Sequence, residues 1–73
     1  MLIRIILKSK SNKDLGLATA KLVDISRFTG CIIAGPVSFK NKKLIDFLNA
    51  NNRTVDFLMK VQLPKSITVE VEA

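Results

Sequence analysis

The chain has 73 residues, 48% of them hydrophobic, and its 12 Lys and Arg residues against 6 Asp and Glu give a formal net charge of +6. This length allows one domain with a modest core, which we expect to be completed by a partner. The positive charge favours polyanions such as nucleic acid, although it also serves solubility alone.

Several kinds of site are not expected because their residues are missing. The chain has no histidine and a single cysteine, Cys31, so neither an internal disulfide nor a zinc or other metal site is predicted, and Cys31 is interpreted as a small buried side chain. No apolar run approaches the ~20 residues that span a bilayer. The apolar stretch in the first residues, MLIRIILK, is too short for a signal peptide and is interrupted too early by charged residues. We therefore expect an intracellular protein with no cofactor and no membrane partner.

The chain opens with a predicted strand and a predicted helix. LIRIILKS, residues 2–9, alternates as a half-buried strand does. The helix is predicted between Ser11 and Gly30, where one apolar stripe recurs at helical spacing: Leu15, Ala18, Leu22, Ile25 and either Phe28 or Thr29. Ser11 or Asn12 is expected to cap it, with Asp14 placed as in a capping box. Gly30 is expected to end it in the left-handed conformation.

Two strands are predicted around a lysine-rich corner. CIIAGPV, residues 31–37, is short and β-branched, and Pro36 places it at a sheet edge because proline has no N–H for a central ladder. LIDFL, residues 44–48, predicts the third strand. Between them, Lys40-Asn41-Lys42-Lys43 is interpreted either as a phosphate contact or as an ordinary polar turn.

A second helix and a fourth strand complete the chain. The helix is predicted within NANNRTVDFLMKVQL, residues 49–63, capped by Asn51 or Asn52 and stopped by Pro64. Its expected inward-facing residues are Val55, Leu58 and Met59. SITVEVEA, residues 66–73, alternates cleanly and predicts the last strand.

The element order predicts the α+β fold known as the split βαβ, or ferredoxin-like, arrangement. Right-handed crossovers place both helices on one face of a four-stranded antiparallel sheet, with the first and third strands at its centre. The prediction is one domain over residues 1–73, with a shortened hairpin at 39–44.

The other face of this sheet is expected to stay uncovered. Alternation directs one set of side chains to the helices: Ile5, Cys31, Ile33, Ile45, Phe47 and Val69. The apolar residues expected on the open face, as a protein interface, are Ile6, Ile32, Ala34, Leu44 and Leu48. We expect a protein or RNA partner to cover an exposed apolar patch of this kind, unless the predicted register of one strand is shifted.

The basic residues gather near strand ends, which we interpret as contacts to RNA phosphates. The candidates are Arg4, Lys8, Lys10, Lys13, Lys40, Lys42, Lys43 and Arg53. No phenylalanine is expected on the open side of a central strand, so the prediction is backbone recognition with strong salt dependence rather than base stacking. The acidic residues occur singly and no glycine loop for phosphate is present, so we expect neither catalysis nor a small-molecule substrate.

Several short motifs agree in order and spacing with one protein family. They are Ile3-Arg4-Ile5, Leu7-Lys8, Ala18-Thr19-Ala20, Thr29-Gly30, Gly35-Pro36, Thr54-Val55-Asp56 and Leu58-Met59. Across nearly its whole length the chain resembles ribosomal protein ten of the small subunit, a universal family. The resemblance implies a structural role in the head of the small ribosomal subunit, with small-subunit rRNA and neighbouring ribosomal proteins as partners, near the path of tRNA and messenger RNA. In bacteria it also implies a transcription antitermination subunit, in which a small helical Nus-type partner meets the first helix and second strand.

Two departures from the family stand out. The long hairpin that family members carry between the second and third strands is missing, and the lysine corner stands as a basic stub in its place. Ile6 occupies a position where the family is often basic, so the open face is more apolar here than is usual in the family. The trimmed hairpin, with heavy use of Lys, Asn and Ile, favours a mitochondrial over a bacterial ribosome. The alternative interpretation is a free antitermination subunit acting as a protein-binding module.

Overall fold

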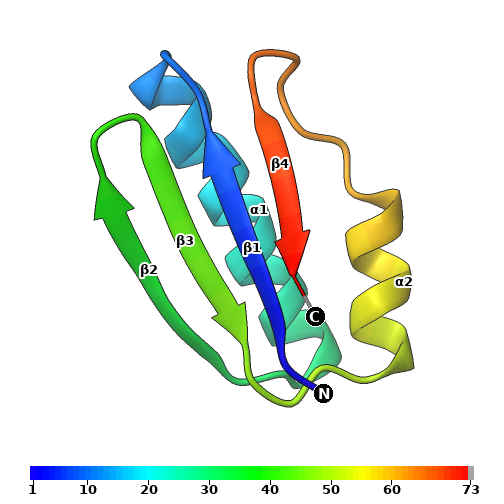
Figure 1. The fold of residues 1–73 in the computed structure, drawn as a ribbon. Helices are drawn as coiled ribbons and strands as arrows, with labels where there is room; N and C mark the ends of the chain where they lie inside the picture. The colour runs from blue at the N-terminus through cyan, green and yellow to red at the C-terminus, as the bar shows by residue number, and fades with distance from the viewer. Residues whose placement is uncertain (73) are drawn as a thin grey trace.

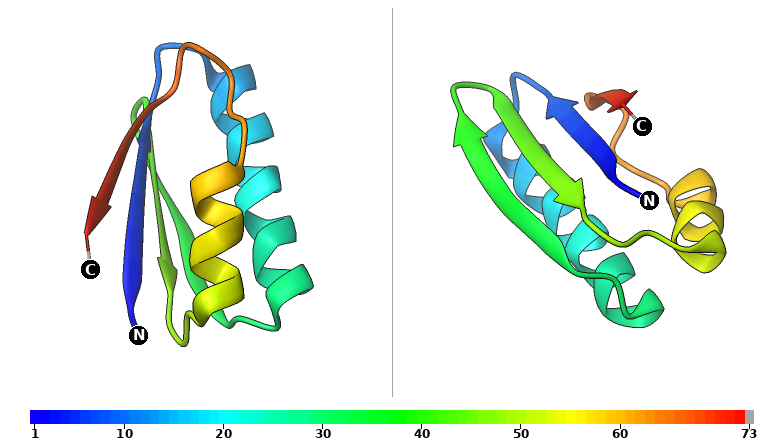
Figure 2. Two further views of the ribbon diagram at one scale, coloured as in Figure 1. Left: turned by 90° about the vertical axis from the view of Figure 1, so that its right-hand side faces the viewer. Right: turned by 60° about the horizontal axis from the view of Figure 1, so that its bottom comes forward.

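The computed structural model describes residues 1–72 (Figure 1). Its elements are β1 (Ile3–Lys8), α1 (Asn12–Thr29), β2 (Ile33–Phe39), β3 (Lys42–Phe47), α2 (Asn52–Lys60) and β4 (Thr68–Glu72). The four strands form one antiparallel sheet in the order β2-β3-β1-β4, and both helices lie on the same side of it (Figure 2). The predicted ferredoxin-like fold is confirmed, with β1 and β3 at the centre and β2 at an edge.

The limits of α1 are the predicted ones, but its capping box is only half formed. Ser11 Oγ accepts a hydrogen bond from the Asp14 N–H at 3.2 Å, and Gly30 ends the helix with a left-handed φ of 69°. The Asp14 carboxylate does not return to the Ser11 N–H; it accepts a hydrogen bond from the Ser66 hydroxyl at 2.7 Å. The Ser11 N–H donates to the Ser9 hydroxyl instead, at 3.0 Å.

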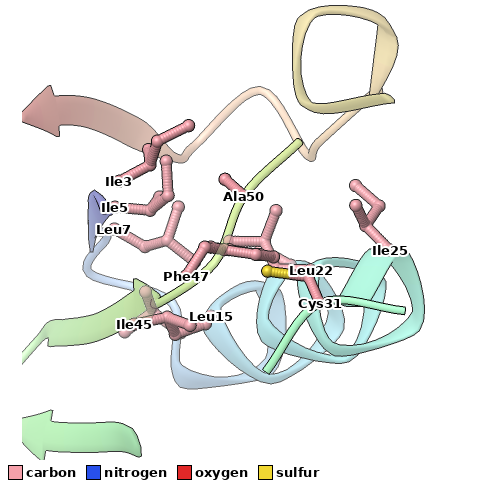
Figure 3. Packing of buried hydrophobic residues seen from close by; sticks show 11 residues of the cluster. Ile3, Ile5, Leu7, Leu15, Leu22, Ile25, Cys31, Ile45, Phe47 and Ala50 are labelled. Atoms are coloured by element: carbon pink, nitrogen blue, oxygen red, sulfur yellow. The ribbon is translucent and has the colours of Figure 1, made fainter. Parts of the chain in front are cut away.

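The core lies between α1 and the helix-facing side of β1 and β3 (Figure 3). Its members are Ile3, Ile5, Leu7, Leu15, Ala18, Leu22, Ile25, Cys31, Ile45, Phe47 and Ala50. Of the two candidates for the end of the α1 stripe, Thr29 is buried and Phe28 is exposed. Cys31 is buried as predicted, and Ile33 packs half-buried against the cluster. Val69 faces the same side but is 44% exposed, because neither helix covers β4.

β2 differs from the prediction in its limits and in its alternation. It runs from Ile33 to Phe39, two residues later than expected at either end. A bulge interrupts its pairing with β3: Ala34 pairs with Asp46, whereas Val37 pairs with Leu44. The extra residue reverses the alternation beyond it, so Val37 faces the open side of the sheet. Strict alternation counted from Ala34 would have placed the Val37 side chain on the helix side of the sheet.

The connection from β2 to β3 is tighter than the predicted corner. Only Lys40 and Asn41 form the turn, while Lys42 and Lys43 already belong to β3. Asn41 has a positive φ of 60°, a conformation that asparagine tolerates better than most residues.

α2 begins as predicted and ends earlier. Asn51 is its N-cap and forms a complete capping box with Thr54, the side chain of each accepting a hydrogen bond from the backbone N–H of the other. The helix ends at Lys60, so Pro64 is not what stops it. Its inward face carries Val55 and Leu58, both half-buried against the core.

Met59 does not face inward as predicted and is 80% exposed. It lies about 100° further around the helix than Leu58, and α2 has its neighbour α1 on one side only. The last strand is also shorter than predicted, since β4 begins at Thr68; Ala73, which the prediction included, lies outside the described residues.

Candidate nucleic-acid interface

Four segments meet at one end of the molecule: the end of β1, the start of α1, the β2–β3 turn and the turn before β4 (Figure 1). Hydrogen bonds tie them together. The Ser9 N–H donates to the Asn41 carbonyl at 3.1 Å, and the hydroxyls of Ser9 and Ser66 lie 2.8 Å apart. These segments carry seven lysines, which we call the lysine end: Lys8, Lys10, Lys13, Lys40, Lys42, Lys43 and Lys65.

A cavity of about 540 Å³ opens at the lysine end. Its lining consists of lysines and small polar residues: Lys8, Ser9, Lys10, Lys40, Asn41, Lys42, Ser66 and Thr68. Lysine ammonium groups are mobile point charges with three donors each, and serine and threonine hydroxyls add further donors. The cavity is therefore suited to the oxygens of a phosphate or of another anion.

The lysines of this cavity differ in how far their charge is already compensated. Lys8 Nζ lies 2.9 Å from Glu70 Oε1, and this hydrogen bond lowers the pKa of Glu70. Lys42 Nζ lies 5.3 Å from the centre of the Phe39 ring, a cation–π contact that does not neutralise its charge, and it contributes less than Lys8 to lowering the pKa of Glu70. Lys10 and Lys40 have no hydrogen bond or ion pair with any side chain of residues 1–72. Lys10, Lys40 and Lys42 thus supply most of the unbalanced positive charge.

Strand alternation separates two lysines that the sequence places side by side. Lys42 pairs with Lys8 on the open side of the sheet, whereas Lys43 pairs with Leu7 on the helix side. Lys43 Nζ donates a hydrogen bond to Ser38 Oγ at 2.7 Å. It lines a second cavity of about 430 Å³, between the hairpin and the start of α1, which Lys40 also lines. The lysine corner therefore serves two surfaces, with Lys40 between them.

The remaining predicted cations are not brought into the cavity. Lys13 is exposed in the first turn of α1 and lines neither cavity. Arg53 lies in the first turn of α2, at the opposite end of the sheet (Figure 1). Arg4 forms two hydrogen bonds with the Asp46 carboxylate, from Nε to Oδ1 at 2.8 Å and from Nη2 to Oδ2 at 3.1 Å. These bonds raise the pKa of Arg4 and lower the pKa of Asp46, so a phosphate would have to compete with Asp46 for the guanidinium.

The apolar part of the open face differs from the predicted protein interface, since it also includes Val37, which pairs with Leu44. Ile6 and Leu44 pair at its centre, flanked by the Arg4–Asp46 ion pair on one side. Ile6 is buried and Leu44 is half-buried, while the other three predicted interface residues are exposed: Ile32, Ala34 and Leu48. Ile32 and Leu48 lie just outside the strands, at the end opposite the lysines.

Two features of this surface were missed by reasoning from the sequence. Asp46 lies between two helix-facing residues, so alternation alone could have placed it on the open face beside Arg4. Phe39 is brought to the open face by the bulge, and its ring is 53% exposed beside Lys42. Pro36 and Gly35 signalled an irregular edge, but not the change of alternation that follows it.

Among residues 1–72, no helix is both long and apolar enough to cross a membrane. In the same part of the chain, no three His, Cys, Asp or Glu side chains come together as a metal ion would require. Compared with models of known protein families, the chain matches none.

Proposed function

We propose that this chain binds RNA through the phosphate backbone at its lysine end, as a structural constituent of a small ribosomal subunit. The observation that supports the proposal most directly is the cavity into which β1, the β1–α1 connection and the β2–β3 turn all bring lysines. Two stretches far apart in the sequence, residues 8–10 and 40–42, contribute their lysines to one positively charged surface, whereas solubility requires only dispersed charge.

A polyanion suits this surface better than a single small anion. The lysines lie on both sides of the hairpin, and Lys40 lines the cavity on each side. Consecutive phosphates of a nucleic acid can engage both sides together, and each neutralised phosphate releases counterions and adds to affinity. Lysines contact phosphates without reading base edges, so the expected binding follows RNA shape more than sequence.

Phe39 adds one contact that lysines cannot make. Its half-exposed ring lies at the sheet edge next to Lys42, where an unpaired base near a bound phosphate can stack on it. A single aromatic residue gives affinity for single-stranded or looped RNA without forming a base-reading platform.

The ribosomal part of the proposal depends on the resemblance of the sequence to ribosomal protein ten of the small subunit. The lysine end by itself supports binding of an RNA backbone from any source. The resemblance directs the proposal to small-subunit rRNA, with neighbouring ribosomal proteins and a contribution to tRNA binding in translation. In this chain the β2–β3 hairpin is closed by two residues, so the proposed contact is made at the hairpin tip.

The RNA-binding proposal is tested by comparing two triple variants in binding to an RNA stem-loop. One changes Lys10, Lys40 and Lys42 to Gln, and its matched control changes Arg27, Arg53 and Lys60 to Gln away from the lysine end. Both lower the formal net charge by the same three units. We expect the first to weaken binding and to reduce the salt dependence by up to about three phosphate equivalents, and the control to bind nearly as the parent does. Equal losses in both variants would mean that net charge, and not the lysine end, drives binding.

The ribosomal assignment is tested separately by co-sedimentation with small ribosomal subunits at moderate salt. The proposal expects the chain in the pellet, and expects the lysine-end variant in the supernatant. A soluble one-to-one complex with a small helical protein, formed without RNA, would instead support the antitermination alternative.

A further inference from the structure

The second edge of the sheet, β4, is free for pairing. Within residues 1–72 no strand pairs with its outer side, since β1 is its only neighbour. The Ser9 N–H donates to the Asn41 carbonyl, which continues the ladder between β1 and β3. The odd-numbered residues of β1 therefore direct their N–H and C=O groups toward β3, and the even-numbered residues direct theirs toward β4. The β4 partners of those even-numbered residues are Thr68, Glu70 and Glu72. Val69 and Val71 therefore direct their N–H and C=O groups outward, to the free edge.

An apolar groove of about 390 Å³ runs beside this free edge, on the helix side of the sheet. Its lining comes from β1, α1, α2, the segment after α2, and β4: Ile3, Ile5, Leu22, Val55, Leu58, Met59, Val61, Leu63, Val69 and Val71. The groove exists because α2 packs against α1 and does not cover β4 (Figure 2). As a result Val71 is 63% exposed and Met59 even more so. The same two valines that offer backbone groups to a partner also offer apolar side chains.

The opposite face of β4 is acidic. Glu70 and Glu72 alternate with the valines and lie on the open side of the sheet, where Arg4 and Ile6 are their partners across the ladder. β1 shows what pairs well with β4: Ile3, Ile5 and Leu7 face the helices, while Arg4 and Lys8, on either side of Ile6, lie beside these carboxylates, and Lys8 Nζ lies 2.9 Å from Glu70 Oε1. A strand on the outer edge meets the same alternation of valine and glutamate.

We propose that β4 accepts an extended segment of a partner protein as a fifth strand of the sheet. The partner segment alternates apolar and basic residues, with its apolar side chains in the groove between β4 and α2 and its Lys or Arg side chains beside Glu70 and Glu72. The backbone hydrogen bonds go to Val69 and Val71. Main-chain pairing supplies affinity, and the groove and the carboxylates supply specificity. This surface is distinct from the lysine end.

A second copy of the chain fits this edge less well than such a partner. Two β4 strands paired antiparallel would bring the glutamates of both copies together on one face, which is unfavourable for like charges across a ladder. Pairing with the β2 edge of another copy meets Pro36 and the bulge between Ala34 and Val37, which interrupt a regular ladder. Charge and edge geometry thus favour a basic heterologous strand.

The test titrates the isotopically labelled protein with short synthetic peptides and follows its NMR signals. In one peptide valine and lysine alternate, in a second valine and glutamate alternate, and in a third the valines and lysines of the first are rearranged into blocks. The proposal expects the first alone to shift the amide signals of Thr68–Glu72 and the methyl signals of Val55 and Leu58, and to slow hydrogen exchange at Val69 and Val71.

Variants at β4 then separate strand pairing from other modes of binding. Val71→Pro removes an outward-facing N–H at an edge position where proline is tolerated. We expect this variant to bind the valine–lysine peptide about tenfold or more weakly than the parent does. Val71→Thr keeps both the N–H and the β-branched shape, so it should bind nearly as the parent does. Glu72→Lys should shift the preference toward the valine–glutamate peptide. The α1 and β1 signals of each variant report whether the fold is kept.

Three results would overturn the proposal. Equal binding by Val71→Pro and Val71→Thr would mean that the edge hydrogen bonds are not used. Equal binding of the alternating and the block peptides would identify the groove as a site for apolar groups in general. Self-association through β4, seen as concentration-dependent shifts of Thr68–Glu72 without peptide, would make a second copy the occupant.

Discussion

The Arg4 guanidinium and the Asp46 carboxylate face each other across β1 and β3, joined by two parallel hydrogen bonds of 2.8 and 3.1 Å. This two-point geometry is the preferred one between arginine and a carboxylate. The pair lies on the open face of the sheet, where the Asp46 side chain is only 16% exposed. It holds β1 and β3 in register and reduces the positive charge that Arg4 offers to an outside ligand.

The Arg4–Asp46 pair predicts a pH dependence of stability. Hydrogen bonding to Arg4 lowers the pKa of Asp46 in the folded state. A carboxyl group with a lowered folded pKa stabilises the fold above its unfolded pKa, about 3.9 for Asp, and this contribution is lost as pH falls through the folded pKa. Asp46→Asn should therefore be less stable than the parent at neutral pH, and the difference in free energy of unfolding should shrink toward about pH 3.

The measurement is urea denaturation of both proteins across this pH range. Asp24→Asn is the control, because Asp24 is exposed on α1 and forms no ion pair with residues 1–72. A deficit of Asp46→Asn that stays constant down to about pH 3 would show that the carboxylate charge does not matter.

The hydroxyl of Thr54 joins the two helices, which predicts a stability loss in Thr54→Val. Thr54 is fully buried and its Oγ1 lies 3.1 Å from Thr29 Oγ1 and accepts the Asn51 N–H at 3.3 Å. Valine keeps the shape but leaves the Asn51 N–H without an acceptor and removes the donor to Thr29 Oγ1, which keeps only its own bond to the Ile25 carbonyl, so we expect a cost of about 1–3 kcal/mol. Chemical denaturation should show this loss, and Thr54→Ser, which keeps the hydroxyl, should lose less. If valine is tolerated better than serine, the methyl packing matters more than the hydrogen bonds.

Two glycines predict opposite effects of the same substitution. A Cβ on Gly35 would lie 2.9 Å from the Leu44 carbonyl oxygen and 3.0 Å from the Val37 nitrogen, and Gly35 has a φ of +96°. Gly35→Ala should therefore destabilise the protein by about 1–3 kcal/mol. A Cβ on Gly16 meets nothing within 4 Å, so Gly16→Ala inside α1 should stabilise by about 0.5–1 kcal/mol. Thermal denaturation of the two variants should shift the midpoint in opposite directions, and a shift in the same direction would contradict this account of the bulge.

Phe39 predicts a contribution to RNA binding that does not depend on salt. Phe39→Leu removes the ring while keeping an apolar side chain, and we expect it to weaken binding to looped RNA by about 1–3 kcal/mol with the salt slope unchanged. Phe28→Leu is the matched control, because Phe28 is also exposed but lies in the last turn of α1. Fluorescence anisotropy over a range of salt concentrations measures both quantities. Equal affinities of the two variants would remove base stacking on Phe39 from the binding mode.

The features that local sequence predicts are those whose causes are local. Ser11, Gly30 and Asn51 act on backbone groups within a few residues of themselves, so the helix starts and the end of α1 follow from their identity. The apolar period of β1 likewise depends only on its own residues. These signals were sufficient for the fold, because a split βαβ arrangement follows from the element order and the handedness of its crossovers.

Most of the features that were missed depend on neighbours distant in sequence; the side of the sheet on which Asp46 lies is the exception, because strand alternation alone gives it. The direction of Phe39 depends on one extra residue in β2 relative to β3, which no property of β2 alone specifies. The exposure of Met59 depends on α2 having no partner on its outer side. The meeting of Lys10 with Lys40 was anticipated only as two separate clusters, since it takes the docking of the hairpin on Ser9 to join them.

The hydrogen bond from the Ser9 N–H to the Asn41 carbonyl has a consequence for the binding of an anion. It anchors the hairpin tip to the end of a central strand, so the backbone that carries Lys10 and Lys40 is already in place before any ligand arrives. Only the side-chain rotamers then have to be ordered on association. The entropic cost of binding is therefore lower than it would be for a flexible basic loop, whose backbone would also have to be ordered.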